Sequence, residues 1–350
     1  MGHDAYVACK ARCLLRTMRD GGIMGINVTW AVWLSTMAVI GTHFTAEPSA
    51  AQATPAGVIT EIDLRGGEAE VKHARLPGWR PVRPLLMLEA GDTVRISRDA
   101  AVVVLLTGSR GTVKVDATKS PFEVPALNPS AGQSKLSRGW ILIGESIRAL
   151  LKVSNDSRQM TLGTRGVGSP PVILTPRNGP ILPDSVVFEW SGRWALRYTI
   201  RVVGPSGVVL ERRDLARTRL AFPPEAAALA PGVRYRVQIT TGGEPPQEAW
   251  FEVVDPVGVK TIRRDLAELA AAAGPMLSAN TLVAVQAAYL ANRGLLVDSR
   301  RALMLALENQ PDEMTFHVLL GDIYERLGLP EQAAGSFAKA RLLLQGHTNR

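Results

Sequence analysis

The C-terminal part of the chain repeats itself at a spacing of 34 residues. When Gly294 is placed under Gly328, two copies near 280–313 and 314–347 align without a gap. The matched pairs are Ala287 and Gly321, Leu290 and Tyr324, Ser299 and Ala333, Leu303 and Phe337, and Ala306 and Ala340. Small residues let two helices approach closely, and large apolar residues fill the space between them. The repeat therefore predicts pairs of packed helices, with a left-handed glycine ending the first helix of each pair.

The second copy resembles the tetratricopeptide repeat. It carries Leu320, Gly321, Tyr324, Ala333, Phe337 and Ala340 at the family's offsets, with His317 where the family often has tryptophan. The resemblance implies that the first helix of each copy lines a concave groove that binds other proteins. The expected groove residues are Thr281, Ala284, Ala288, Thr315, Val318, Asp322 and Glu325. The alternative is a plain bundle of helical hairpins without a binding role.

A further helix is predicted upstream, within a helical region that spans 257–350. Its apolar face includes Leu269, which falls one period before Leu303. This helix therefore reads as half a repeat whose first helix is absent. Three leucines, Leu342 to Leu344, close the last helix without an obvious polar capping helix behind them. Part of this apolar end should be exposed unless it folds back or pairs, and we expect Leu343 and Leu344 to serve partner binding or self-association.

Residues 56–125 change to a period of two. Short alternating segments are separated by turn pairs such as Gly66-Gly67 and Gly91-Asp92, which is typical of an antiparallel sandwich or barrel. The stretch resembles the FecR domain, on the features Gly67, Val71, Trp79-Arg80-Pro81, Leu88, Gly91-Asp92, Val94, Ala101, Val103, Leu105, Gly108 and Val113. Trp79 reads either as a half-buried core aromatic or as a platform for ligand stacking. His73 reads as a lone imidazole at the rim.

Residues 126–167 form a connector. Apolar residues at helical spacing between Trp140 and Ser154 predict a short amphipathic helix. It either packs on a neighbouring domain or lies on a membrane surface, although its polar face is not strongly cationic. The glycines and prolines of 163–171 then mark a domain boundary.

Residues 168–256 return to a period of two, with at least six short strand candidates. That number fits an immunoglobulin-like sandwich. The segment from Leu229 to Tyr235 resembles the Leu-x-Pro-Gly-x-x-Tyr corner of fibronectin type III domains. Its tyrosine hydroxyl is expected to return to a nearby backbone group, and Trp190 is the candidate core tryptophan.

Residues 1–53 read as an export segment. No charged side chain occurs in 21–42, basic residues precede this stretch, and small residues follow it. A secretory signal peptide cleaved near residue 52 or 54 is the first interpretation, and an uncleaved membrane anchor is the second. We expect the rest of the chain to lie outside the cytoplasmic membrane, in the periplasm or cell envelope.

The composition and the motifs narrow the classes of function that the protein can have. The formal net charge is +8, and no Lys/Arg run with interleaved aromatics indicates nucleic-acid binding. Both cysteines, Cys9 and Cys13, precede the apolar segment, so no disulfide is expected beyond it. No catalytic, metal-ligating or cofactor-binding motif stands out, and Ser146 lacks the second glycine of a nucleophile elbow.

The sequence therefore predicts a multidomain protein in which all-β domains precede all-α repeats. Its expected role is a non-catalytic scaffold that binds other envelope proteins through the repeats, with the β domains as a stalk. The alternative is a transmembrane signalling regulator of the FecR type. About 20 residues precede the apolar segment, too few for a folded sigma-binding domain, so that regulatory function is not carried over.

Overall fold

The computed structural model describes residues 55–107, 111–126, 138–156, 171–192, 196–223, 228–242 and 244–348. Contacts divide the chain into two units, Met1–Ala51 and Gln52–Arg350, and the described residues belong to the second. The expected export segment, including 21–42, lies outside the described residues. Within them, no helix is both long enough and apolar enough to cross a membrane.

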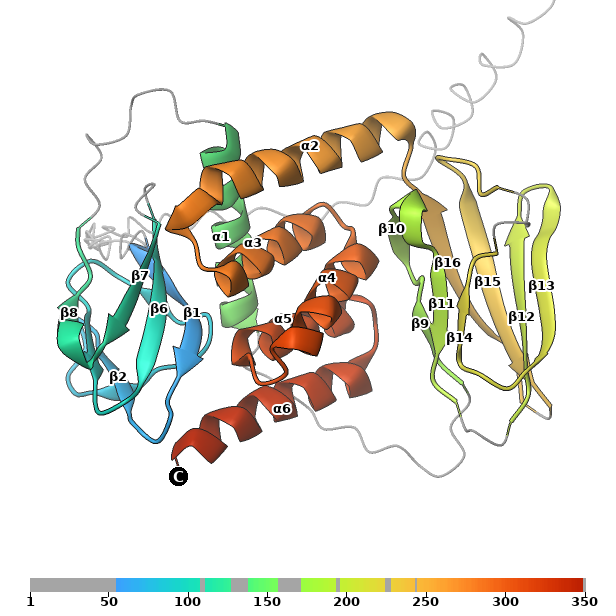
Figure 1. Cartoon of the computed structure of the whole chain (residues 1–350). Helices are drawn as coiled ribbons and strands as arrows, with labels where there is room; N and C mark the ends of the chain where they lie inside the picture. Colours follow the sequence, from blue (N-terminus) through green and yellow to red (C-terminus); the bar gives the residue numbers. More distant parts are fainter. Residues whose placement is uncertain are drawn as a thin grey trace, which may run out of the picture. The chain divides into compact units, whose positions relative to one another are not determined.

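Two antiparallel four-stranded sheets form the first β domain (Figure 1). One has the order β4-β1-β6-β7, with β4 (Met87–Leu88), β1 (Gly57–Asp63), β6 (Ala101–Leu106) and β7 (Thr112–Asp116). The other has the order β3-β2-β5-β8, with β3 (Arg80–Pro81), β2 (Ala69–Lys72), β5 (Thr93–Ile96) and β8 (Phe122–Glu123). Strand β1 is buried on both faces, because Ile59 enters the core of this domain while Val58 joins an apolar cluster with the helices.

The Gly91-Asp92 pair has a structural role in this domain. Asp92 is 1% exposed, and its carboxylate accepts the backbone N–H groups of Ala74 and Glu89 at 2.9 Å. The same carboxylate lies 2.8 Å from Nδ1 of His73. His73 is thus a half-buried partner of a turn-organising carboxylate rather than the lone imidazole that the sequence predicted.

The second β domain is a sandwich of a five-stranded and a three-stranded sheet. The larger has the order β10-β16-β15-β12-β13, with β10 (Gly179–Ile181), β16 (Gln247–Val253), β15 (Arg234–Thr241), β12 (Tyr198–Gly204) and β13 (Gly207–Leu215). The smaller has the order β14-β11-β9, with β14 (Arg219–Ala221), β11 (Val187–Trp190) and β9 (Ile173–Thr175). All pairs are antiparallel except β10 with β16.

Aromatic residues fill the core of this sandwich. Trp190 is 2% exposed, as predicted, and meets the ring of Tyr198 edge to face. The backbone N–H of Ala230 donates to the Tyr235 hydroxyl at 2.7 Å, which confirms the expected corner. The same tyrosine ring stacks on Phe251, so one side chain joins the corner to the core.

The helices are α1 (Arg138–Asp156), α2 (Pro256–Ala273), α3 (Ala279–Asn292), α4 (Leu296–Asn309), α5 (Met314–Arg326) and α6 (Pro330–Thr348). Single 3-10 turns occur at Ala117–Lys119, Pro183–Ser185 and Gly274–Met276. Helices α3 with α4 and α5 with α6 form the two hairpins that the repeat predicted. Gly294 and Gly328 have φ angles of 79° and 71°, which confirms that left-handed glycines end α3 and α5.

The prediction that α2 lacks a helical partner is wrong, because α1 packs against it. Although α1 precedes the sandwich in the sequence, it packs on both α2 and α3, and it lies across them in Figure 1. Leu142, Ile143, Ile147 and Leu150 of α1 are buried in the same apolar cluster as the hairpins. The connector helix is therefore part of the helical core, and the sandwich is inserted between two helices that pack together.

Polar contacts also join the sandwich to the hairpins. Arg177 donates from Nε to the carbonyl of Leu327 at 2.9 Å, at the end of α5. Arg300 of α4 is 8% exposed and forms an ion pair with Glu189 of β11 at 2.9 Å. Helices, sandwich and first β domain thus share buried contacts within one unit.

Candidate functional site

The expected groove residues lie on α3 and α5, but most of them are covered by the chain itself. Thr281, Ala284, Ala288 and Thr315 are at most 5% exposed. Val318 and Asp322 are partly buried, and Glu325 is exposed. As placed, the first four cannot receive an external partner, because strand β1 and helix α1 cover the expected groove, which is called the concave face below.

Strand β1 covers the end of this face where α3 and α5 begin. The Thr315 hydroxyl donates to the carbonyl of Thr60 at 2.6 Å. The hydroxyl oxygens of Thr60 and Thr281 lie 2.8 Å apart. The helices therefore hold an extended segment through both its backbone and its side chains.

A β-bulge makes this contact possible. The pairing of β1 with β6 shifts between Ile59 and Glu61, so Thr60 has no paired residue on β6. Its carbonyl is consequently available for Thr315. An extra residue of this kind disrupts the ladder and redirects the strand locally. No sequence signal marks this bulge.

Glu61 is held at the first turn of α3. Its Oε1 accepts the hydroxyl of Ser278, the backbone N–H of Thr281 at 3.2 Å and the hydroxyl of Thr281 at 2.9 Å. Ser278 is the N-cap residue of α3. A carboxylate at this position is favoured by the unpaired N–H groups and the positive end of the helix dipole.

A second carboxylate, Glu313, lies beside Glu61 as the N-cap of α5. It accepts the backbone N–H of Thr315 and the side-chain amide of Asn280, both at 3.1 Å. Burial raises the pKa of Glu313 to about 7, and repulsion from Glu61 acts in the same direction, while the bonds from Thr315 and Asn280 oppose it. The two glutamates and their hydroxyl and amide partners form a polar cluster where the β domain meets the helices.

Helix α1 covers another part of the concave face. Ala149 of α1 lines a crevice of about 20 Å³ together with Ala288 of α3 and Asp322 of α5. That space holds about one water molecule. This end of the groove is therefore closed to anything larger.

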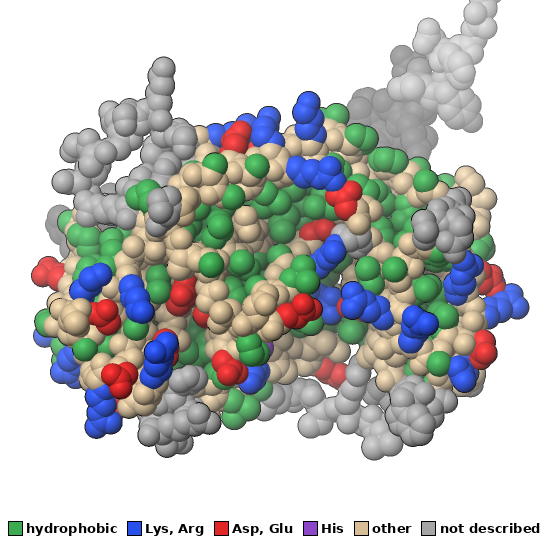
Figure 2. Space-filling model, in the orientation of Figure 1, with side chains coloured by type: hydrophobic (Ala, Val, Ile, Leu, Met, Phe, Trp, Pro, Cys, Tyr) green, Lys and Arg blue, Asp and Glu red, His purple; other side chains and the backbone are tan. Residues whose placement is uncertain are grey.

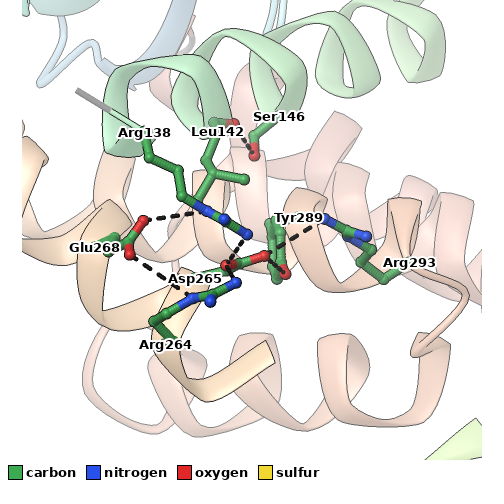
Figure 3. A network of polar contacts seen from close by, with 8 residues as sticks. All are labelled: Arg138, Leu142, Ser146, Arg264, Asp265, Glu268, Tyr289 and Arg293. Atoms are coloured by element: carbon green, nitrogen blue, oxygen red, sulfur yellow. Dashed lines mark hydrogen bonds and ion pairs between the residues drawn. The ribbon is translucent and has the colours of Figure 1, made fainter. Parts of the chain in front are cut away.

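A network around Asp265 fixes α1 in place (Figure 3). Asp265 of α2 is fully buried and forms ion pairs with Arg138 of α1 at 2.7 Å and with Arg293 of α3 at 3.4 Å. It also accepts the Tyr289 hydroxyl at 2.9 Å. Burial opposes ionisation of Asp265, but the bonds from Tyr289 and Arg264 and the charge of Arg138 outweigh it and lower its pKa. Burial and the Asp265 carboxylate raise the pKa of Tyr289 to about 12.

The C-terminal leucines do not form the exposed end that the sequence predicted. Leu343 and Leu344 are partly buried and pack against the apolar cluster that the first β domain forms with Met314 of α5. Leu342 points elsewhere and is 63% exposed. These two leucines of α6 therefore make contacts within the molecule.

The remaining candidates have structural partners. Trp79 is half-buried, and the guanidinium of Arg95 lies 4.2 Å from its ring centroid, so the core-aromatic interpretation fits better than the ligand platform. Ser146 is 1% exposed and donates to the carbonyl of Leu142 at 2.8 Å, in the helix visible in Figure 3. In the part of the chain that the structure describes, no group of three or more His, Cys, Asp or Glu side chains could hold a metal ion.

One surface hollow was not predicted from the sequence. A pocket of about 480 Å³ lies on the larger sheet of the sandwich. Its lining includes Trp250, with the guanidinium of Arg234 stacked at 4.2 Å from the ring centroid. On the molecular face drawn in Figure 2, basic and acidic side chains are interspersed rather than gathered by sign.

Comparison with known proteins does not place the chain in a family. No family model matches it. No curated protein matches it either.

Proposed function

We propose that this chain is a non-catalytic exported protein of the bacterial envelope that binds other proteins through its helical hairpins. The observation that carries the proposal is the seating of β1 against α3 and α5. Hydrogen bonds from Thr315 to Thr60 and from Thr281 to Glu61 hold an extended segment by its backbone and its acidic side chain. A face that recognises such a segment within the molecule has the chemistry to recognise one in a partner.

In this proposal the hairpins are tetratricopeptide-like. The packing of Phe337 against Gly321 supports the resemblance, because a Cβ on Gly321 would overlap that ring. The β domains are FecR-like and fibronectin type III-like, and the order of strands β13-β12-β15-β16 opposite β14-β11-β9 is compatible with the latter. Their role is to display the helices and to occupy the concave face until a partner binds.

The exposed edge beside this closed crevice, where α5 ends, is the proposed first contact for a partner. Glu325 is exposed there, and Asp322 lies one turn earlier, 3.6 Å from Arg326. The proposed partner segment has basic character, because the carboxylate of Glu325 is exposed at this edge. Contact there would let a partner engage before β1 is displaced.

Photocrosslinking in intact cells tests this function. A photoreactive amino acid would replace Glu325, and in a matched control it would replace Leu305, which is 50% exposed on α4. We expect crosslinked protein partners at position 325 and not at 305. Equal crosslinking at both positions, or at neither, would contradict binding through the concave face.

The N-terminus of the protein recovered from cells tests the compartment. Cleavage near residue 52 or 54 is expected for an exported protein. An intact N-terminus in the membrane fraction would instead favour the FecR-type signalling alternative, because that role requires an uncleaved anchor.

A further inference from the structure

We propose that the contact between β1 and the hairpins is a latch that loosens when Glu313 is ionised beside Glu61. The two side chains sit in one polar cluster at the junction of the β domain with α3 and α5. Opening the latch would expose the part of the concave face that β1 covers, so its biological meaning rests on the proposed function, although the latch itself can be tested without any partner.

The carboxylates of Glu61 and Glu313 differ in their hydrogen bonds and in their surroundings. Glu61 accepts three hydrogen bonds from Ser278 and Thr281 at the start of α3. Glu313 receives Thr315 N–H and Asn280 amide bonds but is buried next to Glu61. Like charges held close together and away from water repel strongly. A proton on Glu313 therefore removes the cost of burying its charge, which is the larger effect, and also the repulsion from Glu61.

Among the described residues, no positively charged side chain forms an ion pair with Glu61 or Glu313. On α3 and α5, the groups bonded to Glu313 are the neutral Asn280 and Thr315. The Asp312 carboxylate lies next in sequence, but it is exposed and forms an ion pair with Lys339 of α6 at 3.3 Å. His317 lies 2.9 Å from the carbonyl of Pro311, and burial lowers its pKa. Glu61 from β1 is the charged group that acts on Glu313.

The sign of the effect follows from proton linkage. In the docked form the pKa of Glu313 is about 7, against an ordinary value of 4.5. The docked form therefore holds a proton that the undocked form releases between these values. Docking is favoured fully below pH 4.5, weakens as the pH rises to about 7 and changes little above that. The equilibrium constant for docking should fall by about 100-fold at most over this window.

The apolar contacts limit how far the latch opens. Val58, Leu85 and Leu105 of the β domain share a buried cluster with the helices, and Leu343 and Leu344 pack on the β domain. These contacts do not depend on pH, so the charge pair adjusts an interface that is otherwise stable. The expected state at neutral pH is a small open population rather than complete separation.

Hydrogen exchange on the purified full chain between pH 5 and pH 8 tests the latch. After correction for the intrinsic pH dependence of exchange, peptides covering 57–63 and 279–284 should exchange up to about 100-fold faster at the higher pH. Peptides from β15 in the sandwich serve as the internal reference and should not change. If β15 changes as much as the interface, the latch is wrong.

Two variants and one control complete the test. Glu313→Gln removes the titrating carboxylate, so the extra exchange at high pH should be lost. Glu61→Gln removes the repulsion but leaves Glu313 buried, so the extra exchange should shrink only in part. Glu308→Gln alters an exposed residue at the end of α4 and should behave like the unmodified protein. Retention of the full pH effect in either interface variant would overturn the proposal, and if one variant fails to fold, the other decides. Failure of the crosslinking experiment would leave this result unaffected.

Discussion

Arg138 and Asp265 are separated by 127 positions in the sequence, yet their side chains form an ion pair at 2.7 Å between α1 and α2. Between these two residues the chain completes the whole sandwich. The ion pair therefore closes the helical core across an inserted domain. A helix that the repeat pattern shows as unpartnered gains a partner from upstream.

Replacing Asp265 with asparagine should destabilise the protein by about 2–4 kcal/mol. The carboxylate is fully buried and compensates guanidinium groups from α1, α2 and α3, which would be left without their anion. Arg264→Gln is the control and should cost less than about 1 kcal/mol, because the Arg264 side chain is 50% exposed. Urea denaturation measures the free energy of unfolding of both variants. Equal losses would mean that Asp265 does not anchor α1.

A glycine that approaches an aromatic ring supports the second hairpin. A Cβ on Gly321 would overlap the Phe337 ring, so Gly321→Ala should cost about 1–3 kcal/mol. Gly335 of α6 faces open space, so Gly335→Ala should instead stabilise by about 0.5–1 kcal/mol.

The first copy of the repeat supplies a rescue for this variant. It has Ala287 and Leu303 where the second has Gly321 and Phe337. Combining Gly321→Ala with Phe337→Leu should therefore recover part of the loss in a double-mutant cycle. Strictly additive losses would show that the two positions do not depend on each other.

Local patterns predicted most of the individual elements. The period of two and the flanking turn residues located β1, β2, β5, β6 and β7 and the longer strands of the sandwich, because each of these strands has at least four residues. Strands β3, β4, β8 and β10 are only two or three residues long and contain prolines or follow turns, so no periodicity could reveal them. The glycines at 294 and 328 were predictable because a left-handed residue ends each first helix.

The candidate site was predictable only in its helical half. The repeat offsets placed Thr281 and Thr315 correctly at the start of the first helices. Nothing in the sequence links them to Thr60, because that contact depends on a bulge and on docking between segments more than 200 residues apart. The sequence therefore predicted that the groove residues are exposed, whereas the structure buries most of them.

The C-terminal leucines provide a direct test of internal docking. Leu343→Ser removes an apolar side chain that packs on the first β domain and should destabilise by about 1 kcal/mol, less than for a fully buried leucine. Leu342→Ser changes a 63% exposed side chain and should stay within about 0.5 kcal/mol. Chemical denaturation compares the free energies of unfolding of the two variants. Sedimentation shows whether either variant changes self-association. If Leu343→Ser affects only association, the exposed-end prediction from the sequence would be restored.

The Tyr235 hydroxyl should contribute about 1 kcal/mol to the sandwich. Tyr235→Phe keeps the ring that stacks on Phe251 at 5.5 Å, but it leaves the partly buried N–H of Ala230 without its acceptor. Tyr235→Leu is the comparison, because it removes both the hydroxyl and the stacked ring and should cost clearly more. Thermal or urea denaturation measures the difference between the two variants. If Tyr235→Phe is as stable as the original protein, the corner is held by its Pro231-Gly232 turn and the ring alone, since Gly232 already adopts a φ of 71° that few other residues accept.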